Sequence, residues 1–206
     1  MAADSSLVLA THNPHKLREF GRLLAPAGIT VVALDDGIEL PPEVGDTFAA
    51  NALPKATTAA SATGRVAIAD DSGIEAEALG GAPGVRSARY AGERATDQEN
   101  LDKLLREAPR GSRLRYVCAL AYVDPAVDEE HVFFGECRGT LTDRPRGSRG
   151  FGYDPAFVPD EDPAGRTMAE LGDEEKDAIS HRGRALRALA DWLAERGDPH
   201  SSGGMA

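Results

Sequence analysis

The stretch LVLATHNPHKLREFGRLL, residues 7–24, decides the fold class. Its first part, Leu7–Ala10, is a short apolar run that predicts a buried strand. Apolar residues then recur at helical spacing from Leu17 to Leu24, and Asn13 followed by Pro14 is a favourable helix start. A strand, a polar turn and a helix N-terminus in this order present unpaired backbone N–H groups to an anion. The stretch therefore predicts an α/β unit with a candidate anion site at the turn.

The rest of the chain alternates strand-like and helix-like segments, which predicts an α/β or mixed α+β domain. Four more strands are expected, the last two as an antiparallel hairpin, at residues 29–34, 66–69, 113–123 and 131–141. A helix is expected over residues 47–63, although Pro54 should break or kink it. Another begins at the capping box Thr96–Glu99. The last helix should bury Leu186, Leu189, Trp192 and Leu193 on one face.

The composition fits one globular domain, residues 1–197, followed by a disordered tail, residues 198–206. Of the 206 residues 41% are hydrophobic, and no apolar run approaches the ~20 residues that span a bilayer. The N-terminus has no basic segment ahead of an apolar stretch, so it does not read as a secretory signal. The two cysteines, Cys118 and Cys137, are expected to be reduced core residues. These features together favour the cytosol.

The net charge is −11, from 34 acidic and 23 basic residues. This balance argues against broad nucleic-acid binding, because affinity for the phosphate backbone rests on clustered Lys and Arg. A small anionic ligand remains compatible with it, provided that local cations and a metal ion offset the global field.

Residues 11–16 form the first segment with more polar detail than packing requires. The side chains of Thr11 and Asn13 can hydrogen-bond oxygen atoms, and Lys16 adds a full positive charge beside the helix N-terminus. The alternative is an ordinary capped helix with a solvated lysine. The segment lacks a glycine-rich phosphate loop, so by itself it leaves both interpretations open.

The second segment is the acid pair Asp70–Asp71, directly after an apolar run. Two carboxylates at the end of a strand are costly unless they are solvated, paired or bound to a cation. Successive side chains of a strand point to opposite faces, so one of the two should face a cleft. Magnesium prefers one or two carboxylates together with water and phosphate oxygens. A solvated acid pair in a turn is the alternative.

The third and fourth segments could form a pocket for a flat ligand. Glycines on both sides of Phe151 allow close approach of the backbone, and the ring could stack on a base. Residues 174–183 supply Lys176, His181 and Arg182. The alternatives are a tight turn with one aromatic side chain in the core, and a solvated helix face.

The combination is more specific than its parts. Five motifs occur in order, at residues 11–16, 70–73, 81–90, 151–154 and 180–183. In this arrangement the sequence resembles the inosine triphosphate pyrophosphatase family, also called the XTP/dITP diphosphatases. The resemblance runs from about Leu7 to Trp192. It implies an elongated mixed β-sheet flanked by helices, two lobes with a substrate cleft between them, and a homodimer.

The resemblance also implies roles for individual residues. The triphosphate would be held by Thr11, His12, Asn13, Pro14, His15 and Lys16, with Lys55 and Lys176 as further cations. Asp71 would act as the catalytic base and, with Glu43, would bind Mg²⁺, for which Mn²⁺ is an acceptable substitute. Ser72 would touch the substrate. The base would be surrounded by Phe151, Gly152, Tyr153, Asp154, Lys176, His181 and Arg182.

Two features depart from the family's pattern. Pro54 directly precedes Lys55, which puts the role of that lysine in doubt, and His12 and His15 stand where the family often has smaller residues. Neither histidine is assigned a catalytic role.

The implied reaction is hydrolysis of ITP, dITP and XTP to the nucleoside monophosphate and pyrophosphate. Donors such as Arg182 or Lys176 would read the keto oxygen at position 6 of the base. Three other functions compete with this one. The chain could be a nucleotide sensor without turnover, a pyrophosphatase of the related septum-inhibition type acting on pyrimidine or modified nucleotides, or a structural protein. Five ordered motifs argue against the last.

Overall fold

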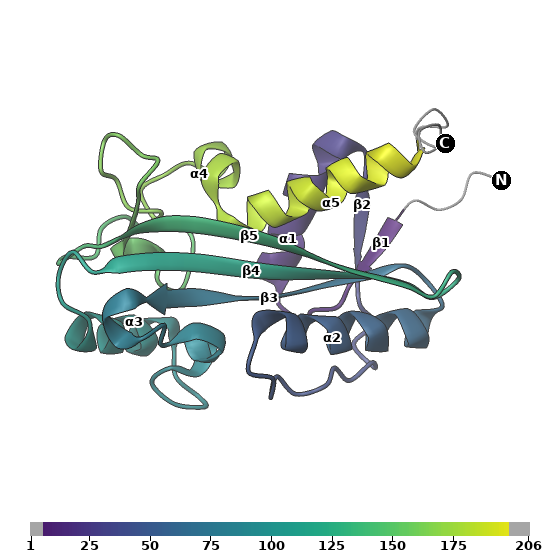
Figure 1. Ribbon diagram of the computed structural model, residues 1–206, viewed down its shortest axis with the longest axis horizontal. Coiled ribbons are helices and arrows are strands. Elements are labelled where there is room, and N and C mark those ends of the chain that lie inside the picture. Colours follow the sequence, from purple (N-terminus) through teal and green to yellow (C-terminus); the bar gives the residue numbers. More distant parts are fainter. Residues whose placement is uncertain (1–5, 198–206) are drawn as a thin grey trace, which may run out of the picture.

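The computed structural model describes residues 6–197, which form a six-stranded mixed sheet with helices on both faces (Figure 1). The strand order is β2-β1-β3-β4-β5-β6. β1 pairs in parallel with both β2 and β3, and the remaining neighbours are antiparallel. The strands are β1 (Ser6–Leu9), β2 (Thr30–Ala33), β3 (Ala67–Ala76), β4 (Arg113–Asp124), β5 (Glu129–Leu141) and β6 (Phe157–Pro159). The predicted mixed α/β fold and its hairpin are confirmed, and β3, β4 and β5 run along the longest axis of the molecule (Figure 1).

Five α-helices flank this sheet in the described part of the chain: α1 (Pro14–Leu24), α2 (Phe48–Thr63), α3 (Asp97–Glu107), α4 (Asp173–Ile179) and α5 (His181–Gly197). Helix α2 packs on one face of the central strands and α5 on the other (Figure 1). The predicted start of α1 is confirmed, since the Asn13 side chain accepts hydrogen bonds from the backbone N–H groups of His15 and Lys16. The capping box of α3 is also present. None of the helices within residues 6–197 is long and apolar enough to cross a membrane.

Strand β3 is longer than predicted. It continues from Ala67 to Ala76, so Asp70 and Asp71 lie in the middle of a strand and not at its end or in a turn. The physical reason is β4, which pairs with β3 over this whole length, from Ala67 opposite Val123 to Ala76 opposite Leu114. Ladder hydrogen bonds with a long partner strand extend β3 beyond its apolar run.

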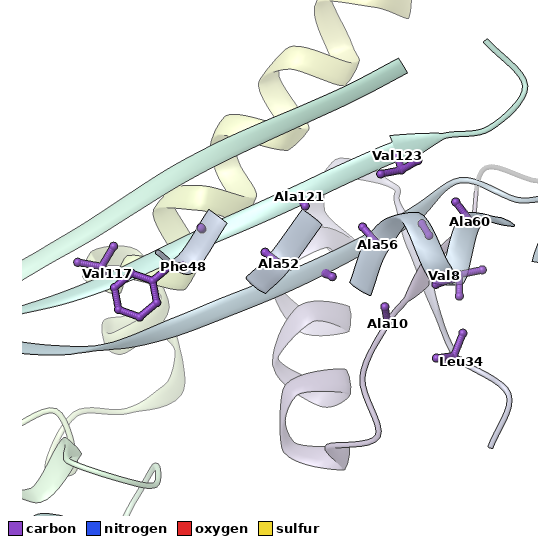
Figure 2. Close-up of a cluster of buried hydrophobic side chains, with 14 residues drawn as sticks. Val8, Ala10, Leu34, Phe48, Ala52, Ala56, Ala60, Val117, Ala121 and Val123 are labelled. Carbon is purple, nitrogen blue, oxygen red and sulfur yellow. The ribbon is translucent and has the colours of Figure 1, made fainter. Parts of the chain in front are cut away.

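Helix α2 runs unbroken through Pro54, so the expected break is absent. One face of α2 is fully buried against β3 and β4 and consists of small side chains: Ala52, Ala56, Ala59 and Ala60. Figure 2 shows this alanine face beside Val117, Ala121 and Val123 of β4. Packing of this kind supplies most of the stability of a helix in a protein and outweighs the loss of one backbone hydrogen bond.

The opposite face of the sheet is covered by α1 and α5. Leu186 and Leu189 are buried there, with Trp192 and Leu193 packed beside them, which confirms the predicted face of the last helix. Cys118 and Cys137 are both buried and free, as predicted. The predicted tail, residues 198–206, lies outside the described residues.

Candidate active site

A pocket of about 620 Å³ gathers nearly all the residues that the motifs predicted. The residues that line it come from the N-terminus of α1, the segment before α2, α2 itself, β3, the 3₁₀ helix η3 (Gly84–Arg89), α3, β4, the loop around Phe151, and helices α4 and α5. Of the predicted site residues the pocket includes Thr11, His12, Asn13, His15, Lys16, Glu43, Lys55, Asp71, Ser72, Phe151, Gly152, Tyr153, Asp154, Lys176, His181 and Arg182. Pro14, the first residue of α1, does not line the pocket.

The two acids of β3 have opposite environments, as the alternation of a strand requires. Asp71 lines the pocket, whereas Asp70 turns towards α1 and α5 and is 2% exposed. Asp70 accepts hydrogen bonds from Lys16 Nζ at 2.7 Å and from Arg182 Nε at 3.3 Å. Burial alone would raise the pKa of Asp70, but the charges of Lys16, Arg182 and Lys55 outweigh it and hold the pKa well below its usual range. Asp70 is therefore a permanent anion beneath the pocket.

Arg182 is the second centre of this buried cluster. Its Nη1 donates to Glu19 Oε2 at 2.7 Å, and its Nη2 donates to the hydroxyl of Ser72 at 2.7 Å. Together with the bonds to Asp70, these contacts engage all three guanidinium nitrogens. The cluster joins α1, β3 and α5, and it fixes Ser72 at the pocket wall.

Within residues 6–197, no cation forms an ion pair or hydrogen bond with Asp71. Its Oδ2 accepts a hydrogen bond from Asn51 Nδ2 at 2.8 Å. Burial and the nearby carboxylate of Glu43 raise the pKa of Asp71 to about 6, although the Asn51 bond and the charges of Lys55 and Lys16 oppose the shift. A buried carboxylate that lies near another acid and holds its proton this tightly provides a favourable place for a cation.

Glu43 completes the acidic side of the pocket. Its Oε1 accepts a bond from Lys55 Nζ at 2.6 Å, and Lys55 also donates to the backbone oxygen of Asp70 at 2.7 Å. Lys55 thus reaches the site in spite of Pro54. Within the described residues no group of three or more His, Cys, Asp or Glu side chains could hold a metal ion. Two carboxylates suit Mg²⁺, which takes its remaining ligands from water and phosphate oxygens.

The other end of the pocket is aromatic. The ring of His181 stacks on Tyr116, with centroids 4.6 Å apart and planes 7° apart. Burial, followed by the charges of Arg182 and Lys176, lowers the pKa of His181 well below its usual range, so the ring is neutral. Its Nδ1 is buried and has no hydrogen-bond partner in the part of the chain that the structure describes. A buried nitrogen of this kind is costly, which suits it to a ligand.

Phe151 also lines the pocket. Lys176 Nζ lies 5.4 Å and the Arg182 guanidinium 5.7 Å from the centre of the Phe151 ring. Lys176 also donates to Asp154 Oδ2 at 2.6 Å, and the same oxygen accepts the backbone N–H of Phe151. The ring is therefore held at one wall by a fixed turn and two cations.

The motifs missed several residues that complete the pocket: Ser87, Arg89, Asp97, Asn100 and Tyr116. Ser87 and Arg89 lie inside the quoted motif 81–90 and had no assigned role. The motifs also missed Asn51, which donates a hydrogen bond to Asp71 and lies one helical turn before Lys55. That i, i+4 spacing was the available signal.

Comparison with known proteins decides the family. The sequence model of the Ham1 family matches residues 7–192. The chain belongs to the Ham1 family. The match covers every motif named above, together with both faces of the sheet.

Two curated relatives are similar to the chain along almost their whole length. The chain is 50% identical over 198 residues to a dITP/XTP pyrophosphatase of Yersinia pseudotuberculosis, covering 92% of this chain and 98% of that protein. It is 51% identical over 194 residues to the protein of the same name from Shigella flexneri, covering 91% and 97%.

Two solved structures share the fold. A HAM1 protein from Coxiella burnetii matches with a TM-score of 0.83 and 40% identity, covering 92% of this chain and 98% of that one. A nucleoside-triphosphatase, dITP/XTP pyrophosphatase, from Mycobacterium abscessus matches with a TM-score of 0.70 and 44% identity, covering 89% and 98%. These likenesses agree with the mixed sheet described above.

Proposed function

We propose that this chain hydrolyses non-standard purine nucleoside triphosphates, ITP, dITP and XTP, to the nucleoside monophosphate and pyrophosphate. The names of relatives with about half of their residues identical support this activity. The observation that carries it in the structure is the position of Asp71. This carboxylate lies in one pocket with the cations Lys16 and Lys55 and with the aromatic end formed by Phe151 and His181.

Each part of the pocket has a chemical task in this proposal. The N-terminus of α1, with Thr11, Asn13 and Lys16, would bind the phosphates, and Lys55 would add charge at the leaving pyrophosphate. Asp71 and Glu43 would hold Mg²⁺, or Mn²⁺ in its place, and the ion would neutralise charge on the phosphate oxygens. Asp71 would also orient or deprotonate the water that attacks the α-phosphorus. A carboxylate bound to a cation is a weaker base, which favours orientation of the water.

The aromatic end would supply selectivity. Phe151 would stack on the purine, and the free Nδ1 of His181 and the ammonium of Lys176 would face its polar edge. Hypoxanthine and xanthine carry a keto oxygen where adenine carries an amino group. A donor that faces the amino group is left unpaired, and a site built on hydrogen bonds rejects such a mismatch strongly.

The test is pyrophosphate release from ITP, dITP, XTP, ATP and CTP, each with Mg²⁺ and after exhaustive chelation. The first three should be cleaved far faster than ATP and CTP, and chelation should abolish release. Equal rates for ITP and ATP would contradict the base pocket, and full activity without metal would contradict the metal site. Tight binding of ITP without pyrophosphate would identify a sensor, and preference for pyrimidines the septum-inhibition type.

The proposal extends to a homodimer in the cytosol. Two buried cysteines without a disulfide fit a reducing compartment. Sedimentation velocity at several protein concentrations would measure the mass in solution, and a species with the mass of a single chain at all of them would contradict the dimer.

A further inference from the structure

Asn51 is a buried polar residue on α2 that links Asp71 to the segment that carries Glu43. It is 3% exposed. Its Nδ2 donates to Asp71 Oδ2 at 2.8 Å, and its Oδ1 accepts the backbone N–H of Gly45 at 2.7 Å. Nδ2 also contacts the backbone oxygen of Gly45 at 3.5 Å. One side chain therefore contacts the carboxylate of Asp71 and the backbone two residues after Glu43.

The segment that carries Glu43 depends on such anchors because it has no regular secondary structure from Gly37 to Asp46 apart from turns and bends. Lys55 and Arg89 also hold it, at the Glu43 side chain and at its backbone oxygen. Neither of those two donates a hydrogen bond to Asp71 among the contacts of the described residues. Asn51 differs from them because its side chain contacts both the Asp71 carboxylate and the backbone of the segment that carries Glu43.

The lack of a side chain at Gly45 permits this contact. A methyl group added at Gly45 would lie 2.8 Å from both Asn51 Oδ1 and the β-carbon of Ala50, closer than real side chains approach. The backbone at this point therefore approaches the Asn51 amide as closely as a residue without a side chain permits.

We propose that Asn51 is a positioning residue that sets the orientation of Asp71 and the placement of Glu43 relative to it, and thereby the geometry of the cation site. The inference rests on the proposed function, because it takes Asp71 and Glu43 as the ligands. Partners behind metal ligands of this kind orient the ligating atoms, and their loss commonly weakens metal binding by about 10- to 100-fold.

The experiment measures Mn²⁺ binding to the whole protein at neutral pH, from the electron paramagnetic resonance signal of free Mn²⁺. Asn51→Leu keeps the approximate size and removes all these contacts, and Mn²⁺ should bind about 10-fold more weakly or worse. Gly45→Ala leaves the polar groups of Asn51 and Asp71 in place but forces Asn51 and the segment of Glu43 apart, so it should weaken binding too. In the double variant the loss should be smaller than the product of the two single losses, because both act through one link.

Thr167→Val is the matched control. Thr167 is fully buried and donates to the backbone oxygen of Arg146 at 2.8 Å, away from the pocket. The variant loses a buried hydrogen bond, and with it stability, but its affinity for Mn²⁺ should equal that of the parent. A general loosening of the fold would weaken Mn²⁺ binding in this control as well.

Each outcome decides the inference. Folded Asn51→Leu protein that binds Mn²⁺ as the parent does would overturn it and leave the metal site intact. If Asn51→Leu fails to fold, Gly45→Ala decides alone: weaker binding supports the link, and unchanged binding overturns it. A parent protein that binds no Mn²⁺ would overturn the cation site itself, and this inference with it.

Discussion

Asp70 and Asp71 are adjacent in β3, yet the strand turns one carboxylate into a cluster of buried cations and the other into the pocket. The pKa of Asp70 lies well below its usual range and that of Asp71 is raised to about 6. Two neighbouring acids with such different environments can serve different purposes. Asp70 holds cations in place, and Asp71 is available for chemistry.

Asp71→Asn should abolish most hydrolysis while the protein still binds ITP. The change keeps the shape but removes the charge that would hold a cation and orient water, so the rate of pyrophosphate release should fall by about 10²- to 10⁴-fold. Lys16 and the aromatic end remain, so ITP should still bind, measured by calorimetry. A folded variant that releases pyrophosphate at the parent rate would exclude Asp71 from catalysis.

Asp70→Asn should affect stability more than Asp71→Asn does. The variant leaves the buried Arg182 with Glu19 as its remaining acidic partner and leaves Lys16 without its ion pair. Removal of one partner of a buried pair costs about 3–5 kcal/mol, which urea denaturation would measure. Under conditions in which both variants are fully folded, the rate of pyrophosphate release should fall less in Asp70→Asn than in Asp71→Asn. The reverse order would mean that the roles of the two acids are exchanged.

The pH dependence of stability should report the raised pKa of Asp71. The folded, metal-free protein binds this proton more tightly than the unfolded chain, whose carboxyl has an ordinary pKa of 3.8. This stabilising contribution is present below pH 3.8 and is lost as the pH rises through about 6. Urea denaturation should therefore show the parent losing stability relative to Asp71→Asn across that range. If the difference in free energy of unfolding between the parent and Asp71→Asn does not change with pH, the pKa of Asp71 is not raised in the folded protein.

His181→Phe should reduce the preference for ITP over ATP. The variant keeps an aromatic ring to stack on Tyr116 and removes the unpartnered Nδ1. Loss of one hydrogen bond to the base corresponds to about 1 kcal/mol, so the ratio of kcat/KM values should fall roughly 5-fold. If the ratio stays unchanged while both rates are retained, Nδ1 does not face the base.

Gly135→Ala should destabilise the fold on the face of the sheet that α5 covers. A methyl group there would overlap the backbone oxygen of His181 and the N–H of Ala185, where α5 crosses β5. Forcing the helix away should cost about 1–3 kcal/mol or more, visible as a lower Tm. Gly21→Ala is the control: Gly21 lies in α1 with open space around its α-carbon, so this change should raise stability by about 1 kcal/mol.

Local signals were sufficient for much of the fold. Asn13 and Pro14 predicted the start of α1, the Thr96 capping box predicted the start of α3, and two strand-like segments joined by a polar turn predicted the β4–β5 hairpin. Each of these depends on a few neighbouring residues. The length of β3 depends instead on its register with β4, about fifty residues further along the chain, and no local pattern carries that information.

In the candidate site, too, some features were predictable from local sequence and others depended on distant residues. The ordered motifs predicted most of the residues that line the pocket, but they did not predict the hydrogen bonds and ion pairs between those side chains. Arg182 pairs with Glu19 across 163 positions, and Asn51 meets Asp71 from another element. The i, i+4 spacing places Asn51 on the same side of α2 as Lys55, but it does not give the partners of Asn51, which become visible once Gly45 and Asp71 are seen on either side of it.

The cluster of Glu19, Asp70 and Arg182 also imposes an order on biosynthesis. Its members come from the beginning, the middle and the end of the chain, on α1, β3 and α5. Until α5 has been synthesised, Glu19 lacks Arg182 as its partner, Asp70 can pair with Lys16 but not with Arg182, and Ser72 lacks its donor from Arg182. Nascent chains that already have most of the sheet would therefore lack a working centre until the last helix emerges and docks.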